Sequence, residues 1–440
     1  MRKKWFLASL AIILINTPIQ AQQDTIYAWD LESCIEYALR ENIQIKRSRI
    51  AFEESREDTK TAEAALFPDL SFSTSQSYSN QPWIDGNTGD RNTYSGSYGL
   101  NTSWTVYNGG RRLQTIDQQK IQDRIALFNI AQTENTIEEA IAQAYIQILY
   151  AYESVMTIEN TVEVSLAQVE RARQLFEIGI LARSDVAQLE AQYSNDKYSL
   201  ISAQTALRSY KLQLKQLLEL QGEEDIEVVI PEIDDSEILI PLPSKTDVYA
   251  AALALRPEIQ GSLLSVESSH MSIGIARSAY MPTISLSAGL GTGHNTTSDF
   301  SFTNQIKNRW NESIGVTLSL PIFNNRQTKS AVNKAKLAYE DSKLSYLNEQ
   351  KNLYSTVENL WLDATAAQER FVAALEKLNS SKISYELVSE QFDVGLRNTV
   401  ELLIEMNNVL SAQQEVLQAK YSAVLNIQLL RFYQGENIEL

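Results

Sequence analysis

Ala65-Leu66-Phe67-Pro68-Asp69-Leu70-Ser71-Phe72-Ser73 recurs later in the chain as Ala279-Tyr280-Met281-Pro282-Thr283-Ile284-Ser285-Leu286-Ser287. In both stretches a proline ends a helix-like segment, and apolar residues then alternate with small polar ones, as in a β-strand. Four more blocks recur in the same order, and all five have offsets of 213 to 216 residues: 38–44 with 254–260, 106–108 with 322–324, 176–180 with 392–396, and 221–222 with 434–435. Five blocks in one order indicate a tandem duplication.

The duplication divides the chain into two repeats and a connector. We expect repeat 1 over residues 22–222 and repeat 2 over residues 247–440, each with short helices, two strands and two long helices. The strands are predicted near residues 68–82, 93–107, 282–294 and 309–321. Residues 223–246 hold eight acids and three prolines. This composition predicts a solvated connector, with a specific acidic binding loop as the alternative.

The long helices are too long for a compact domain. Residues 111–176 contain neither proline nor glycine, and a helix of that length extends about 100 Å at 1.5 Å per residue. In the next helix, apolar residues recur every seven positions from Val186 to Leu214, with a companion row from Leu189 to Leu217 that only Asp196 interrupts. This spacing predicts coiled-coil packing. Sparse cations disfavour the alternative, an amphipathic helix on a membrane surface.

The predicted strands have one apolar face and one small polar face. From Thr93 onward, one face carries Tyr94, Tyr98, Leu100 and Trp104, and the other carries only Ser, Gly, Asn and Thr. A soluble sheet with one buried face is the usual explanation, but here the flanking helices are rods that leave no cover. The pattern favours a transmembrane β-barrel. Four strands cannot close a barrel, so several chains must pool their strands.

Composition excludes several classes of function. The 440 residues carry 38 Lys+Arg against 55 Asp+Glu, a net charge of -17, which argues against nucleic acid as a partner. One Cys and two His leave no disulfide, no histidine-rich or thiolate metal site and no Ser-His-Asp triad. We therefore expect no catalytic residues, no metal and no cofactor. A barrel enzyme is disfavoured because no nucleophile, base and oxyanion set converges.

The N-terminus is typical of a secretory signal peptide. Arg2, Lys3 and Lys4 precede an apolar run from Trp5 to Ile15, and small residues lead to Ala21. Eleven apolar residues are too few to span a bilayer, which needs about 20. We predict a signal peptide over residues 1–21, cleaved after Ala21.

These residues resemble the TolC-like family of outer-membrane efflux and secretion channels over essentially the whole mature chain. The resemblance rests on the run from Cys34 to Leu39 with Asn42, the two proline-led strand starts, and the turns at residues 176–180 and 392–396. It implies a mainly α-helical homotrimer. Its twelve-stranded β-barrel in the Gram-negative outer membrane would continue into a long helical barrel through the periplasm, with an equatorial collar.

The resemblance also implies where partners dock and where the channel closes. The helix–helix turns of the family form the periplasmic tip that meets an adaptor protein. The corresponding residues here are Ile178, Gly179, Ile180, Val394, Gly395 and Leu396. Arg397 falls on the family's locking arginine, Ser184 and Asp185 on its partner positions, and Glu401 on a ring acid. Phe392 and Ile404 replace a tyrosine and a second ring acid.

Together these features predict a passive, gated exit duct of a tripartite efflux pump. It would work with a periplasmic adaptor (membrane fusion protein) and an inner-membrane RND or ABC transporter. The exit duct of a type I protein secretion system is one alternative. A membrane-anchored trimeric coiled-coil adhesin or scaffold is another, but it explains neither the duplicated strand pairs nor the hairpin-like tips.

Overall fold

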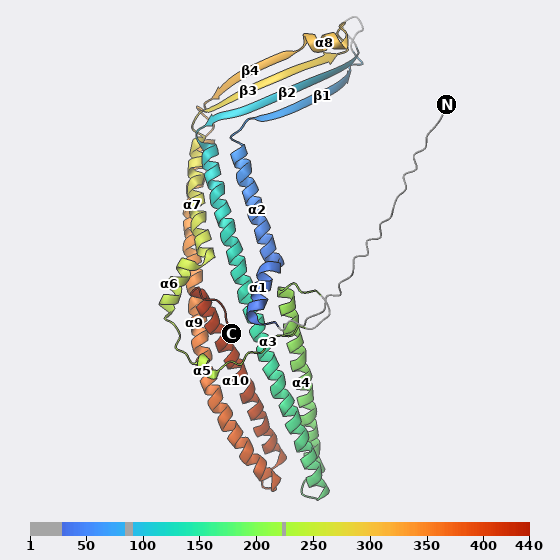
Figure 1. Ribbon diagram of the computed structural model, residues 1–440, viewed down its shortest axis with the longest axis vertical. Coiled ribbons are helices and arrows are strands. Elements are labelled where there is room, and N and C mark those ends of the chain that lie inside the picture. Colours follow the sequence, from blue (N-terminus) through green and yellow to red (C-terminus); the bar gives the residue numbers. More distant parts are fainter. Residues whose placement is uncertain (1–28, 84–90, 222–225) are drawn as a thin grey trace, which may run out of the picture.

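The computed structural model describes residues 29–83, 91–221 and 226–440, so the predicted signal peptide lies outside the described residues. The molecule is long, mainly helical, and has one antiparallel sheet (Figure 1). The sheet forms one end, and two helical hairpins form the other. Both the expected helical character and the small antiparallel β part are confirmed.

The first half of the chain builds half of the sheet and one hairpin. Its elements are α1 (Leu31–Glu41), α2 (Ile43–Ala64), β1 (Asp69–Asn80), β2 (Asn92–Asn108), α3 (Arg111–Glu177) and α4 (Arg183–Leu217). Pro68 follows α2, and Gly110, with φ of 79°, stands directly before α3. Pro68 thus separates α2 from β1, as the sequence indicated, and the left-handed Gly110 separates β2 from α3.

The second half builds the rest of the sheet and the other hairpin. Its elements are α5 (Asp235–Ile238), α6 (Lys245–Leu255), α7 (Pro257–Ser278), β3 (Thr283–Asn295), α8 (Phe302–Asn308), β4 (Asn311–Ser319), α9 (Gln327–Asp393) and α10 (Thr399–Tyr433). Helices α3 and α9 both have 67 residues, and α4 and α10 both have 35. At 1.5 Å per residue, α3 and α9 are each about 100 Å long.

The sheet has the order β1-β2-β3-β4, and all neighbouring strands are antiparallel. The register places apolar residues beside one another, as in the row Phe72, Leu100 and Leu290. The opposite face carries rows of small polar residues, such as Ser71, Asn101, Gly289 and Ser313. Both faces are open: on the apolar face Phe72 is 68% exposed and Ile314 is 89% exposed, and on the polar face Ser71, Asn101 and Ser313 are exposed. Within the described residues, β1 and β4 each keep one unpaired edge.

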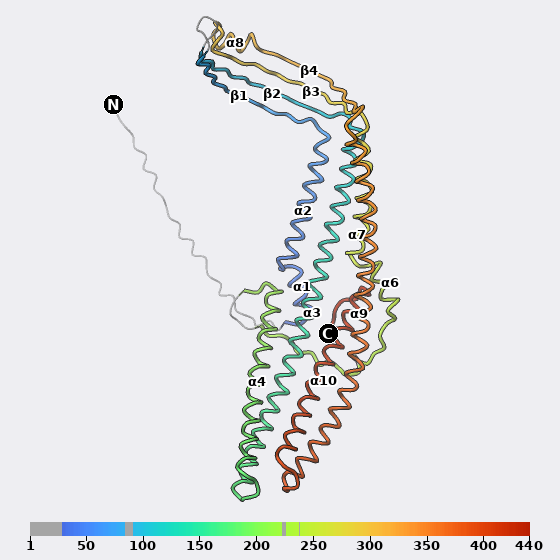
Figure 2. Tube along the Cα trace, turned by 180° about the vertical axis from the view of Figure 1, so that it is seen from behind, coloured from blue at the N-terminus to red at the C-terminus, as the bar shows by residue number. Residues whose placement is uncertain are grey.

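The main core lies in the middle of the molecule, where the connector crosses the long helices (Figure 2). The hydroxyl of Tyr145 on α3 donates to the carbonyl of Val229 at 2.7 Å, and the indole of Trp361 on α9 donates to the carbonyl of Pro243 at 3.1 Å. The ammonium of Lys420 on α10 donates to the carbonyl of Ile233 at 2.9 Å. Side chains of three helices thus hold the described part of the connector.

Helices α5 and α8 were not expected. α5 is a single turn of four residues inside the predicted connector. α8 has seven residues in the β3–β4 loop, where polar residues give no helical period. Contacts with β3 hold it: the Thr292 hydroxyl donates to the carbonyl of Ile306 at 2.7 Å. Such tertiary contacts leave no pattern in a sequence.

Candidate functional site

The two helix–helix turns have the same backbone geometry. Gly179 has φ of +81° and Gly395 has φ of +78°. The amide of Ile180 donates to the carbonyl of Leu175 at 2.9 Å, and the amide of Leu396 donates to the carbonyl of Gln391 at 2.8 Å. These are Schellman motifs, in which a left-handed glycine satisfies the last carbonyls of a helix. The glycines predicted for the tips are therefore required by the turn.

Aliphatic side chains project from these turns. Their exposed fractions are 69% for Ile178, 57% for Ile180, 70% for Val394 and 76% for Leu396. A small buried cluster lies behind them, formed by Val169, Ala172, Leu175, Val186, Leu189, Phe392 and Leu402. Each tip thus presents exposed aliphatic side chains, and buried apolar residues support them from behind. Such a surface suits contact with another protein.

The acidic residues of the predicted gate cap the second helix of each hairpin. The amide of Ala182 donates to the carboxylate of Asp185 at 3.2 Å. The amide of Asn398 donates to the carboxylate of Glu401 at 3.3 Å, and Asn398 Oδ1 accepts from the amide of Glu401 at 2.9 Å. Only α10 has the full reciprocal capping box, because Ala182 has no side-chain acceptor. Ser184 is exposed beside Asp185.

Arg397 binds within its own tip. Its guanidinium donates to Gln391 Oε1 at 2.8 Å and to Glu401 Oε1 at 3.0 Å. Within the described residues of one protomer it does not meet Asp185 or Ser184. The structure therefore brings Arg397 together with Glu401, and it leaves Ser184 and Asp185 on the other hairpin.

A series of polar contacts that the sequence did not reveal joins the two hairpins. Arg171 on α3 reaches Asp393 on α9 at 3.4 Å. Farther from the tips, the hydroxyl of Ser154 on α3 donates to Gln414 on α10 at 2.8 Å. The hydroxyl of Tyr421 donates to Glu153 at 2.8 Å. Any separation of the hairpins must break these contacts. Asp393 belongs to the recurring block 392–396, but its partner Arg171 and the other residues of this series lie outside the recurring blocks, so only the fold reveals the contacts.

Asp196 is buried in the seam between α3 and α4, with 2% of its surface exposed. Gln192 donates to its Oδ1 at 2.8 Å, and its Oδ2 has no hydrogen-bond partner among the residues that the structure describes. Burial raises the pKa of this carboxyl, and hydrogen bonds from Ser165 and Gln192 act against that rise. The interruption seen in the sequence is thus a buried carboxyl between α3 and α4.

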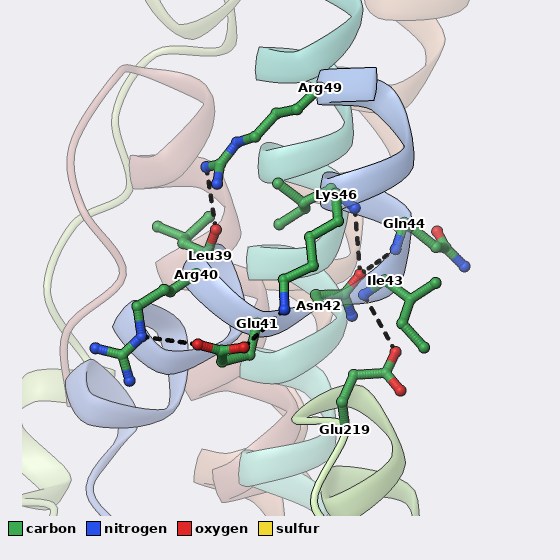
Figure 3. Close-up of polar contacts among 10 residues, drawn as sticks. Leu39, Arg40, Glu41, Asn42, Ile43, Gln44, Lys46, Arg49 and Glu219 are labelled. Carbon is green, nitrogen blue, oxygen red and sulfur yellow. Dashed lines mark hydrogen bonds and ion pairs between the residues drawn. The ribbon is translucent and has the colours of Figure 1, made fainter. Parts of the chain in front are cut away.

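A polar joint connects α2 to the upper end of α4 (Figure 3). Asn42 is buried, its Oδ1 accepts from the amide of Gln44 at 2.8 Å, and its Nδ2 donates to the carbonyl of Leu217 at 2.9 Å. The amide of Ile43 donates to Glu219 at 3.3 Å. Asn42 therefore caps one helix and holds the end of another, which fixes the first hairpin relative to the helices that lead to the sheet.

In the second half of the chain, Arg256 stands between α6 and α7, as Asn42 stands between α1 and α2. The Arg256 side chain is 8% exposed and binds Glu139 on α3 at 2.7 Å and Glu258 at 3.0 Å. Its guanidinium also lies 3.9 Å from the ring centroid of Tyr433, at the end of α10. One buried cation thus joins α3, α7 and α10.

The described residues contain no group of three or more His, Cys, Asp or Glu side chains able to hold a metal ion. Across the same part of the chain, no helix combines the length and the apolar character that crossing a membrane requires.

Comparison with known proteins gives one family. The sequence profile of the outer membrane efflux protein family matches residues 34–219 and 248–436. Among curated relatives, the outer membrane protein TolC of Vibrio cholerae is 26% identical, and the match covers 76% of this chain and 75% of TolC. The outer membrane efflux protein BepC of Brucella suis is 22% identical, with coverage of 95% and 88%.

The fold matches solved structures of such proteins. A crystal structure of CusC superposes with a TM-score of 0.78 at 19% identity, covering 92% of this chain and 91% of CusC. The channel OprN gives a TM-score of 0.76 at 20% identity, with coverage of 93% and 91%. The relatives are efflux and channel proteins rather than enzymes. The chain therefore belongs to the outer membrane efflux protein family, and it is a protein of the outer membrane of Gram-negative bacteria.

Proposed function

We propose that three copies of this chain form the exit duct of a tripartite efflux pump, which passively conducts substrates from an inner-membrane RND or ABC transporter to the exterior. The observation that carries the proposal is the four-stranded sheet with two open faces and two unpaired edges. An open sheet edge cannot persist in hydrocarbon. Three sheets, each joined through β1 and β4 to its neighbours, would make a closed twelve-stranded barrel.

The two faces of the sheet support this assembly. The apolar rows, with Phe72, Leu100 and Leu290, would face lipid, and the rows of Ser, Gly, Thr and Asn would line water. The helices, each about 100 Å long, would extend the duct through the periplasm. The equal lengths of α3 and α9, and of α4 and α10, support the proposed two repeats, 22–222 and 247–440. The connector, 223–246, would lie at the equator.

The tips supply the proposed docking surface and gate. The exposed aliphatics around Gly179 and Gly395 would meet the adaptor. Arg397 is exposed and lies on one hairpin, whereas Ser184 and Asp185 lie on the other. In an assembled ring these residues would face one another between protomers, and Glu401 would hold Arg397 in position.

Native mass spectrometry and planar-bilayer recording test the assembly. We expect a homotrimer that conducts ions, and a monomer or a non-conducting trimer would contradict the proposal. A rod on the surface of intact cells that external protease cleaves would instead favour an adhesin.

A single substitution tests the gate. Arg397→Ala should raise the resting conductance, and Lys351→Gln, which removes an exposed cation on α9 far from the tip, should not. Resting conductance unchanged by Arg397→Ala would refute the role of Arg397 in closure.

A further inference from the structure

α8 lies at the end of the sheet far from the helical tips (Figure 1), and it packs on the apolar face. Two contacts place it there. Thr292 donates to the carbonyl of Ile306, and the ring centroids of His294 and Phe302 lie 4.9 Å apart. Thr292 pairs with Tyr98 in the sheet, so it belongs to the face that carries the apolar rows.

A buried glutamine fixes the orientation of α8. Gln305 is 6% exposed. Its Nε2 donates to the carbonyl of Phe300 at 2.8 Å, and its Oε1 accepts from the amide of Asn295 at 2.8 Å. The segment is therefore held firmly against β3, and the side chains on its outer side have a defined direction.

The exposed surface of this segment combines aromatic rings with cations. Phe300, Phe302 and Trp310 are 61%, 56% and 54% exposed. Lys307 and Arg309 are also exposed, and neither forms an ion pair within the described residues. Residues 300–311 contain no acid, although the chain has 55 Asp+Glu against 38 Lys+Arg; Asp299 and Glu312 flank them, and the indole of Trp310 donates to the carboxylate of Glu312 at 2.9 Å. The segment between these two acids is a basic aromatic patch on an acidic protein.

We propose that this patch, residues 300–310, binds the phosphate-bearing glycolipid of the outer leaflet. The inference rests on the proposed barrel, in which the apolar face turns to lipid. Aromatic rings favour the level of the headgroups, and basic side chains there attract anionic lipid. Arg309 can hold a phosphate through two parallel hydrogen bonds. The patch continues the lipid-facing rows of the sheet, so a lipid is the occupant that fits both its apolar and its charged parts.

The test measures glycolipid binding to the full-length protein. Detergent-extracted wild type and K307Q/R309Q are titrated with lipid A and with dephosphorylated lipid A, and bound lipid is counted by native mass spectrometry. For lipid A we expect about 30-fold weaker binding by the variant, because each basic side chain at an anionic lipid surface contributes about fivefold. For dephosphorylated lipid A we expect equal binding.

Two further variants serve as controls. K351Q/K382Q removes two exposed cations from α9 and should bind lipid A as the wild type does. K307R/R309K keeps both charges and should also bind it. Equal lipid A binding by wild type and K307Q/R309Q would overturn the inference. So would an equal loss with dephosphorylated lipid, or a K307Q/R309Q trimer destabilised in lipid-free detergent, which would assign the cations to a subunit contact.

Conductance measured on the same preparations separates the two proposals. Conducting trimers with unchanged lipid A binding would overturn the lipid site alone. Protein that binds lipid A through these cations but does not form conducting trimers would overturn the proposed duct.

Discussion

Asp185 and Glu401 hold the same place in the two tips. Each is the third residue of its helix, and each carboxylate accepts a hydrogen bond from the backbone amide just before that helix, at 3.2 Å and 3.3 Å. The residues that resemblance assigned to a gate therefore already stabilise the helix starts. Substitution at either position will affect the local helix as well as any contact between protomers.

The ion pair between Arg171 and Asp393 should help to keep the hairpins together. Both side chains are about half exposed, and such a pair contributes about 0.2–1 kcal/mol. Arg171→Ala and Asp393→Asn should each raise the open fraction of the channel by up to about fivefold, and the double variant should add little. Single-channel recording gives these fractions.

The matched control lies within one hairpin. Arg173 on α3 binds Glu190 on α4 at 2.6 Å, so Arg173→Ala should leave the open fraction unchanged. Fully additive effects of the Arg171 and Asp393 substitutions would show that the pair does not couple the hairpins.

Gly179→Ala and Gly395→Ala should destabilise the tips. In the described part of the chain no atom lies within 4 Å of an added Cβ at either glycine, so the cost comes from the left-handed backbone, about 1–2 kcal/mol. Faster hydrogen exchange at the amides of Ile180 and Leu396 would reveal it. Gly261→Ala in α7 is the control, because there the new Cβ lies 3.6 Å from Phe128 Cβ and φ is ordinary. A slower exchange at the tips would contradict this account.

Asp196→Asn should stabilise the protein at neutral pH. Because burial raises the pKa of Asp196, the folded state binds this proton more tightly than the unfolded chain does, and stability falls as pH rises through the raised pKa. Removing the charge should raise the free energy of unfolding by about 1–3 kcal/mol at pH 7.5, which is the cost of burying a polar group without a hydrogen-bond partner. The gain should shrink as the pH is lowered toward 4.

Thermal unfolding at several pH values measures this difference. Asp341→Asn, at an exposed position on α9, should change the melting temperature equally little at every pH. A pH-independent effect of Asp196→Asn would mean that its carboxyl does not titrate differently in the folded state.

Arg256→Met should cost about 3–5 kcal/mol of stability, because it leaves Glu139 and Glu258 without their shared cation. Thermal unfolding in detergent should show the loss, and the triple variant R256M/E139Q/E258Q should recover most of it. Arg56→Met, which breaks the exposed pair with Glu53, should be nearly neutral. A loss that the triple variant does not recover would point to the lost packing against Tyr433.

Local signals in the sequence predicted most of the fold. Pro68 and Pro282 mark strand starts, the long stretch free of Gly and Pro marks α3, and the turn glycines mark the tips. α8 could not be predicted, because seven polar-rich residues are helical only through contacts with β3.

The tip contacts were harder to predict than the tips themselves. Arg397 was expected opposite Asp185, but within one protomer it turns to Glu401, four residues further on. Arg171 and Asp393 are 222 positions apart, and although Asp393 lies in the repeated turn 392–396, nothing in that motif indicates Arg171 as its partner. Side-chain partners across packed helices depend on rotation and register, which a single sequence does not specify.

The two open edges of the sheet have a genetic consequence. If the barrel closes by pairing β1 of each chain with β4 of the next, a single chain whose edge strand cannot pair leaves the whole barrel open. A mutant allele that blocks one edge, for example by placing proline in β4, would then act in a dominant-negative way. In a cell that expresses both alleles, most trimers would contain at least one mutant chain and hence one unpaired β1–β4 junction. Export would then fall by more than the fraction of mutant protein in the cell.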